Sequence, residues 1–73
     1  MNPYISDIKI TGDVLRSWRK SAGMTQTEAA RSINIKTRRT INNWERGVSS
    51  PSHNHVIALA KNYGTFNQLL DLL

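Results

Sequence analysis

The 73-residue sequence has no cysteine, which excludes disulfide bonds and cysteine-based metal sites as sources of stability. It also has no uninterrupted apolar run near the ~20 residues that span a bilayer. Its first ten residues show neither the basic start nor the apolar stretch of a secretory signal. These absences argue against disulfide-dense secreted domains and helical membrane proteins. We expect a soluble, cytoplasmic protein without a membrane partner.

Acidic residues are scarce in the middle of the chain. Between Val14 and Gly47 there are two, Glu28 and Glu45, against eight lysines and arginines. This segment therefore carries the whole excess behind the formal net charge of +5. A concentrated basic segment on a folded unit is typical of proteins that bind polyanions. A solvated basic surface without a partner gives the same composition, and charge alone does not separate the two interpretations.

A chain of this length is expected to form one domain, here spanning 1–73, with a small core because it buries only ~60% of its unfolded surface. Apolar residues recur at helical spacing, and no segment alternates convincingly as a strand would. The expected helices cover about 12–22, 25–34, 37–46, 52–63 and 66–72, after an N-terminal arm at 1–11. The sequence thus predicts an all-α fold, a compact five-helix bundle around one core.

The ends of these helices carry recognisable signals. Thr11 is a suitable N-cap, and Thr25 with Glu28 has the pattern of a capping box. Gly23 follows the first helix and Asn34 the second. Both residue types tolerate the left-handed conformation in which helices commonly end. A short helix, a tight turn and a further helix are therefore expected between Thr25 and the middle of the chain.

The helix expected at 37–46 combines an inward and an outward face. Ile41 and Trp44 lie three residues apart and are expected in the core, as is Trp18; base stacking by the tryptophans is the alternative. The opposite side carries four polar side chains: Arg38, Arg39, Asn42 and Asn43. Arginine pairs bidentately with guanine and asparagine with adenine in the major groove, and asparagine is otherwise a poor mid-helix residue. We predict that these four read DNA bases; an ordinary solvated surface is the alternative.

Other polar residues give weaker signals. His53 and His55 could indicate a metal site, but residues at i, i+2 do not share a helix face, so capping or phosphate contact is the preferred interpretation. Ser49, Ser50 and Ser52 have no base histidine in a plausible catalytic triad. We therefore expect no catalytic residues, no metal and no cofactor, and do not expect an enzyme.

Several short elements recur together at a characteristic spacing. They are Leu15, Arg16 and Arg19 before Gly23, then Met24-Thr25-Gln26, Ala30, Thr40-Ile41, Trp44-Glu45-Arg46-Gly47, Pro51, Leu59-Ala60 and Tyr63-Gly64. In this pattern the chain resembles, over about 14–64, the helix-turn-helix domain of the lambdoid phage repressor and Cro group, the xenobiotic response element family. Three features depart from the family pattern: Asn34 replaces a glycine, Ala29 replaces a leucine, and the turn at 35–37 is one residue longer.

The resemblance implies a role for each matching residue. Bases would be read by Arg38, Arg39 and Asn43, with Asn42 beside them. Backbone phosphates would be contacted by Thr25, Gln26, Lys36, Thr37, Arg46, Ser49, Ser50 and Ser52. The longer turn leaves open which of Lys36, Thr37 and Arg38 reaches a base. Arg19 and Glu45 match a partly buried ion pair that ties the first helix to the recognition helix, so Arg19 is not expected to contact DNA.

By the same resemblance we expect a sequence-specific regulator of transcription in a bacterial cell or phage-infected host, most simply a repressor that binds double-stranded DNA. One domain touches few base pairs, so a homodimer on a palindromic operator is expected, with half-site centres ~34 Å apart or a multiple. The segment 65–73 is the candidate dimerisation helix, and we assign its apolar side chains to the interface: Phe66, Leu69, Leu70, Leu72 and Leu73. The alternative is an antitoxin-like or adaptor protein whose main role is to bind a protein partner.

Overall fold

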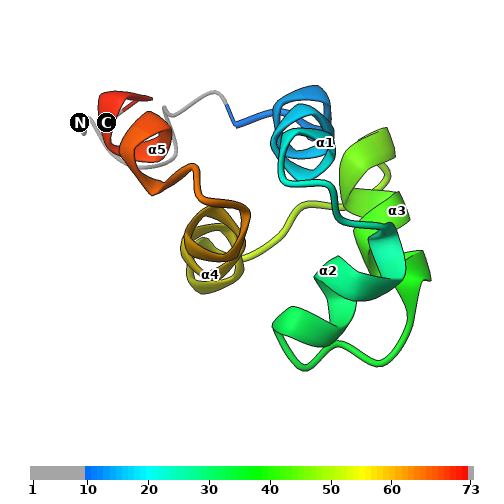
Figure 1. Cartoon of the computed structure of the whole chain (residues 1–73). Coiled ribbons are helices and arrows are strands. Elements are labelled where there is room, and N and C mark those ends of the chain that lie inside the picture. The colour runs from blue at the N-terminus through cyan, green and yellow to red at the C-terminus, as the bar shows by residue number, and fades with distance from the viewer. Residues whose placement is uncertain (1–9, 73) are drawn as a thin grey trace.

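The computed structural model describes residues 10–72. These residues form five helices and no strand: α1 (Gly12–Ser21), α2 (Gln26–Ser32), α3 (Arg38–Arg46), α4 (His53–Tyr63) and α5 (Phe66–Leu72) (Figure 1). The prediction of an all-α fold with five helices is confirmed. Most of the predicted N-terminal arm, and Leu73, lie outside the described residues.

The helices are arranged around α4. This helix packs against α1, α2 and α5, while α2 and α1 both pack against α3 (Figure 1). In the view of Figure 1, α5 and the pair α2–α3 lie on opposite sides of the molecule. None of the described helices has the length and apolar character that crossing a bilayer requires.

Side-chain caps start three of the helices. The Thr11 hydroxyl accepts from the Val14 backbone N–H at 3.3 Å, and the Ser52 hydroxyl caps α4 in the same way. At α2 the predicted capping box is present. The Thr25 hydroxyl accepts from the Glu28 N–H at 3.1 Å, and the Glu28 carboxylate accepts from the Thr25 N–H at 2.8 Å. These bonds satisfy N–H groups that have no partner within the helix itself.

The helix α2 ends in a Schellman-type turn, earlier than predicted. Its last residue is Ser32, and Asn34 adopts the left-handed conformation with a φ of 62°. The Ile35 N–H then bonds to the Ala30 carbonyl at 2.9 Å and closes the turn. From α4, the Asn62 side chain donates to the Ser32 carbonyl at 3.2 Å and to its hydroxyl at 2.9 Å. The end of α2 and the start of the turn into α3 are thus fixed by α4.

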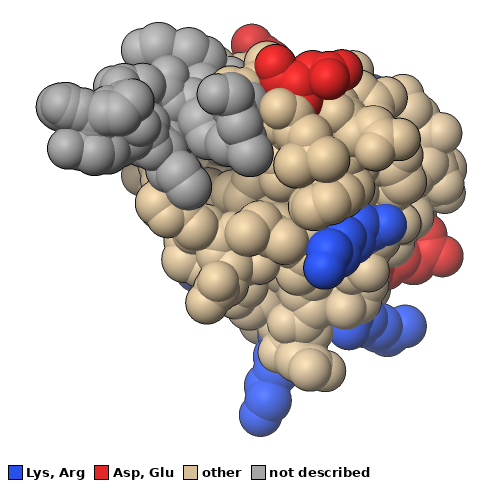
Figure 2. All heavy atoms as spheres, turned by 90° about the vertical axis from the view of Figure 1, so that its left-hand side faces the viewer, with Lys and Arg blue, Asp and Glu red and all other residues tan. Residues whose placement is uncertain are grey.

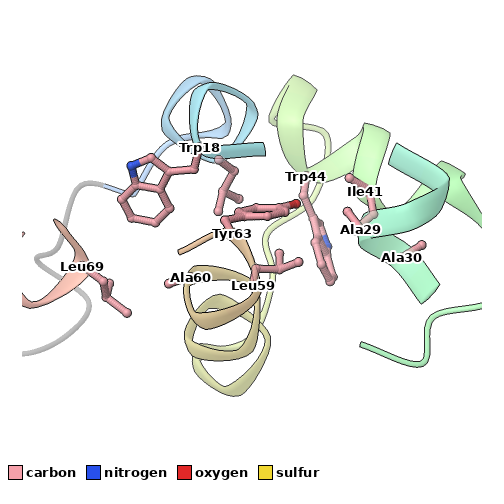
Figure 3. Packing of buried hydrophobic residues seen from close by; sticks show 10 residues of the cluster. Trp18, Ala29, Ala30, Ile41, Trp44, Leu59, Ala60, Tyr63 and Leu69 are labelled. Atoms are coloured by element: carbon pink, nitrogen blue, oxygen red, sulfur yellow. The ribbon is translucent and has the colours of Figure 1, made fainter. Parts of the chain in front are cut away.

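Every helix contributes to one buried core. Its members are Leu15, Trp18, Ala29, Ala30, Ile41, Trp44, Leu59, Ala60, Tyr63 and Leu69 (Figure 3). The two tryptophans lie on either side of Tyr63 in Figure 3, which confirms the core interpretation over base stacking. Ala29 and Ala30 are small, and both are almost completely buried. Their size lets the neighbouring helices approach α2 closely.

The apolar side chains of α5 divide between the core and the surface. Leu69 is only 5% exposed and packs in the core, so it is not available for the dimer surface to which the sequence analysis assigned it. Phe66 is half-buried, with the Lys61 ammonium 5.4 Å from its ring centroid. Leu70 and Leu72 are 48% and 44% exposed. The predicted surplus of apolar residues on α5 therefore consists of Leu70 and Leu72 in the described part of the chain.

Candidate DNA-binding surface

The basic side chains are unevenly distributed. Seen from the side of α4 and α5, lysines and arginines are few and scattered (Figure 2). Most of the exposed lysines and arginines belong to α1, α3 and the turn before α3: Arg16, Lys20, Lys36, Arg38, Arg39 and Arg46. The candidate surface is therefore the outer side of α3 together with the parts of α1 and α2 that adjoin it.

Two polar rows run along α3 at the helical spacing i, i+4, i+7. The buried side of the helix is anchored by Ile41 and Trp44, which pack in the core. We call Arg38, Asn42 and Glu45 the inner polar row, and Arg39, Asn43 and Arg46 the outer polar row. The two rows differ in what they contact, and this difference decides which side chains are available to a partner.

At the end of the inner polar row, Glu45 forms a buried ion pair with Arg19 of α1. Arg19 Nε donates to Glu45 Oε2 at 2.6 Å and Nη2 donates to Oε1 at 3.0 Å. Arg19 Nη1 also donates to the Met24 carbonyl at 2.9 Å. The hydrogen bond with Glu45 raises the pKa of the Arg19 guanidinium above its ordinary value, so the guanidinium stays charged. Together these bonds fix α3 relative to α1 and to the start of α2.

The side chain of Gln26, the first residue of α2, links all three members of the inner polar row. Its Nε2 donates to Asn42 Oδ1 at 3.2 Å and to Glu45 Oε1 at 3.1 Å. Its Oε1 accepts from Arg38 Nη1 at 3.1 Å. A continuous network therefore runs from Arg19 through Glu45 and Gln26 to Asn42 and Arg38. Bonds of this kind orient side chains and limit their free rotation.

This network changes the sequence-based picture of four base-reading side chains. Arg38 and Asn42 are engaged with Gln26, whereas the sequence analysis treated them as free. Arg38 and Asn42 are engaged because of the helical register. Glu45 was expected to pair with Arg19, and Arg38 and Asn42, seven and three positions earlier, lie on the same face of the helix. That register was visible in the sequence. The identity of the linking residue, Gln26, depends on how closely α2 approaches α3, which periodicity does not give.

The side chains of the outer polar row, unlike those of the inner polar row, are not engaged in hydrogen bonds with other described residues. Arg39 and Arg46 are exposed and Asn43 is half-buried. Within residues 10–72, none of their side chains takes part in a hydrogen bond or an ion pair. Their donors and acceptors therefore remain available, on a helix whose position is fixed from both neighbouring helices.

Five of the eight residues predicted to contact phosphate lie at the two ends of α3. Lys36 and Thr37 precede the helix, and Thr37 is its N-cap without making a side-chain cap bond. Ser49 and Ser50 follow α3 and are exposed. Thr25 and Ser52 are exposed too, but their hydroxyls already accept cap bonds.

The two histidines lie in the first turn of α4. The His55 ring lies with its centroid 5.2 Å from that of Trp44 and its Nδ1 3.2 Å from the Ser52 hydroxyl. His53 is exposed at the first position of the helix. In the part of the chain that the structure describes, no group of three potential metal-ligating side chains comes together. The capping interpretation thus accounts for His55.

Comparison with known families agrees with this geometry. A helix-turn-helix family model, that of the lambda repressor and Cro type, matches residues 15–65, which is more than half of the chain. Searches of curated proteins and of solved structures gave no match. The matched range contains α2, the turn, α3 and the Arg19–Glu45 pair that joins α1 to α3. The chain therefore belongs to the lambda repressor/Cro-type helix-turn-helix family of DNA-binding transcription regulators, the xenobiotic response element family.

Proposed function

We propose that this regulator is a repressor that binds a palindromic operator as a homodimer, with α3 in the major groove. The observation that supports the proposal most directly is the outer polar row. Arg39 and Asn43 lie one helical turn apart, and their side chains have no partner within residues 10–72. The network of Arg19, Glu45 and Gln26 holds the helix that carries them.

The outer polar row has the chemistry of direct base readout. Arg39 can donate two N–H groups to guanine O6 and N7, and Asn43 can pair with adenine N6 and N7. A good bidentate pair discriminates against the wrong base by ~1–3 kcal/mol. Arg38 uses one N–H on Gln26 and keeps its other donors, while Asn42 keeps its amide N–H groups. We assign these two a supporting part in readout, in the orientation that Gln26 gives them.

Phosphate contacts would set the register of α3 in the groove without reading the sequence. We assign them to exposed groups at the two ends of the helix: Lys36, Thr37, Arg46, Ser49 and Ser50. Thr25 keeps a hydroxyl proton to donate beside its cap bond. Gln26 and Ser52 are less suited to phosphate contact because their side chains are engaged within the chain.

A homodimer is proposed because one module of this kind reads few base pairs. Two copies on a two-fold operator would place their recognition helices about one DNA turn apart, ~34 Å. We assign the dimer surface to the exposed part of α5, where Leu70 follows half-buried Phe66 by one helical turn and Leu72 is exposed too. Apolar side chains grouped on a surface are typical of protein interfaces.

Selection of binding sites from random duplex DNA tests the base-reading and symmetry parts of the proposal together. The expected consensus is an inverted repeat with half-site centres one turn apart or a multiple. A consensus without two-fold symmetry would contradict the homodimeric operator, and failure to enrich any sequence would contradict specific readout.

Sedimentation of the free chain tests the dimer surface. The charged variant Leu70→Glu/Leu72→Glu should sediment as a monomer where the parent is a dimer, with Ile57→Glu on α4 as a control at another exposed apolar position. Truncation of α5 is less informative, because it also removes Leu69 from the core. A monomeric parent, with or without DNA, would favour the adaptor alternative in which Leu70 and Leu72 face a different protein.

A further inference from the structure

An open recess of about 380 Å³ lies where α1, the first residue of α2 and α3 come together. Its lining residues are Arg16, Arg19, Lys20, Gln26, Asn42, Glu45 and Arg46. Four of them, Arg19, Gln26, Asn42 and Glu45, also belong to the network that orients the inner polar row. The recess is therefore continuous with the surface to which base reading is assigned above.

The recess is strongly cationic. Four of its lining side chains carry a positive charge, and the one carboxylate, that of Glu45, is already bonded twice by Arg19. Arg16, Lys20 and Arg46 are exposed and make no ion pair within residues 10–72. Three cations from two helices thus surround a hollow in which none of the acidic side chains that the structure describes neutralises them. An anion that enters the hollow would be attracted by all three cations.

A purely structural explanation covers only part of this cluster. Lys20 lies in the last turn of α1 and Arg46 in the last turn of α3, where a cation interacts favourably with the helix dipole. Arg16 lies in the middle of α1, where the dipole gives no such benefit. Its side chain is exposed and has no partner among the described residues. Arg16 is therefore the exposed cation of the recess that the helix dipole does not explain.

We propose that the recess binds a phosphodiester group of the DNA backbone beside the groove that α3 enters, and that Arg16 and Lys20 of α1 are contacting residues. This inference rests on the proposed function and adds two residues to it. The backbone of DNA is a more fitting source of phosphate than a free anion, because Asn42 lines the recess and lies on the helix that reads bases. A duplex held by α3 would bring a phosphate to the recess at high effective concentration.

The salt dependence of binding measures such contacts. For B-DNA, log K falls with log salt concentration with a slope of about −0.9 for each phosphate that the protein neutralises. The full chain, Arg16→Gln and Lys20→Gln should be compared on the selected operator and on random duplex. Each substitution should make the slope shallower by about 0.9 per protomer, on both DNAs alike. Lys61→Gln is the matched control, since it removes an exposed charge from α4, away from the recess.

Ethylation interference shows whether the contact is direct. One backbone phosphate per half-site should weaken parent binding when ethylated, and it should lose this effect with Arg16→Gln. Slopes that equal the parent's in both variants, or an equal change in Lys61→Gln, would overturn the recess as a phosphate site. Saturable binding of inorganic phosphate in the recess without any effect on duplex affinity would also overturn it. A parent chain that binds no duplex would instead overturn the proposed function itself.

Discussion

The backbone of Gly12 in α1 packs directly against the carbonyl group of Glu45 in α3. A Cβ atom at position 12 would lie 2.2 Å from the Glu45 oxygen and 2.6 Å from the Trp44 oxygen. No side chain fits between these two segments, so glycine is needed for the approach itself. The same two helices are joined by the Arg19–Glu45 ion pair. The start of α1 and the end of the recognition helix α3 are thus in close backbone contact.

Gly12→Ala should destabilise the fold, because both of the oxygens that the new methyl would meet belong to the backbone and cannot rotate away. Overpacking of this kind typically costs ~1–3 kcal/mol. Urea unfolding followed by circular dichroism measures the change. Ser17→Ala, at an exposed position on α1, is the control and should change stability little. Equal stability of Gly12→Ala and the parent would show that α1 and α3 can separate at this joint without cost.

Loss of one partner of the Arg19–Glu45 pair should be more costly than loss of both. Glu45→Leu leaves a guanidinium that is 9% exposed without its carboxylate, and breaking a buried pair in this way costs ~3–5 kcal/mol. The double variant Arg19→Met/Glu45→Leu replaces both charges by apolar groups of similar size and should recover much of the loss. Urea unfolding of the two single variants and the double variant gives the coupling energy. If the losses in free energy of unfolding of the two single variants add up to that of the double variant, the pair has no coupling energy.

Much of this site could be predicted from sequence, because local patterns determine helix ends and register. The capping box at Thr25 and the left-handed Asn34 follow from residue type. Close approach between helices was not predictable in the same way. The sequence analysis marked Gly12 only as a helix start and Gln26 only as a phosphate contact, since their partners lie more than ten positions away and depend on interhelical distance. Leu69 was assigned to the surface because a short helix with many leucines does not reveal which of them faces α4.

Tyr63 offers a test of an unpaired polar group in the core. Its side-chain oxygen is buried and has no hydrogen-bond partner among the described residues. Because a buried hydroxyl without a partner has lost its hydration, Tyr63→Phe should leave stability at pH 7 unchanged or raise it by about 1 kcal/mol. Thermal unfolding of the two proteins measures this. A loss beyond 1 kcal/mol would reveal a bond that the hydroxyl makes in solution.

The same residue should make stability fall at high pH. Burial raises the pKa of Tyr63 from its ordinary value of 10.0 to about 12, with a smaller contribution from the charge of Glu45. Between these values the unfolded chain loses the phenol proton while the folded chain keeps it, so the unfolded state binds fewer protons and stability decreases as pH rises. The loss should be on the order of 2 kcal/mol and should be absent from Tyr63→Phe. Urea unfolding of the parent and of Tyr63→Phe at pH 9 and pH 11.5 measures this loss. An equal loss of stability in both proteins would contradict the assignment of the pH dependence to Tyr63.

Arg39→Ala should weaken binding to the selected operator and relax preference at one base pair in each half-site. The expected loss is ~1–3 kcal/mol for a bidentate contact, with little change on random duplex. Arg31→Ala removes an exposed arginine from α2 and is the matched control. Titration of labelled operator and of a set of single-base variants measures both affinity and preference. An equal loss on operator and random DNA would show that Arg39 contacts phosphate.

Gln26→Ala distinguishes orientation from direct contact. The substitution removes the partner that holds Arg38 and Asn42, while leaving Glu45 with its two bonds from Arg19. If these bonds orient base-reading side chains, operator binding should fall more than binding to random duplex, because Arg38 and Asn42 must then be ordered by the DNA itself. The expected loss is about tenfold, the equivalent of roughly 1.4 kcal/mol. Gln68→Ala, at an exposed glutamine on α5, is the control. An equal loss of affinity for all sequences would instead indicate that Gln26 leaves this network to bind a phosphate. The bonds of Arg38 and Asn42 with Gln26 would then stabilise the fold without orienting base-reading side chains.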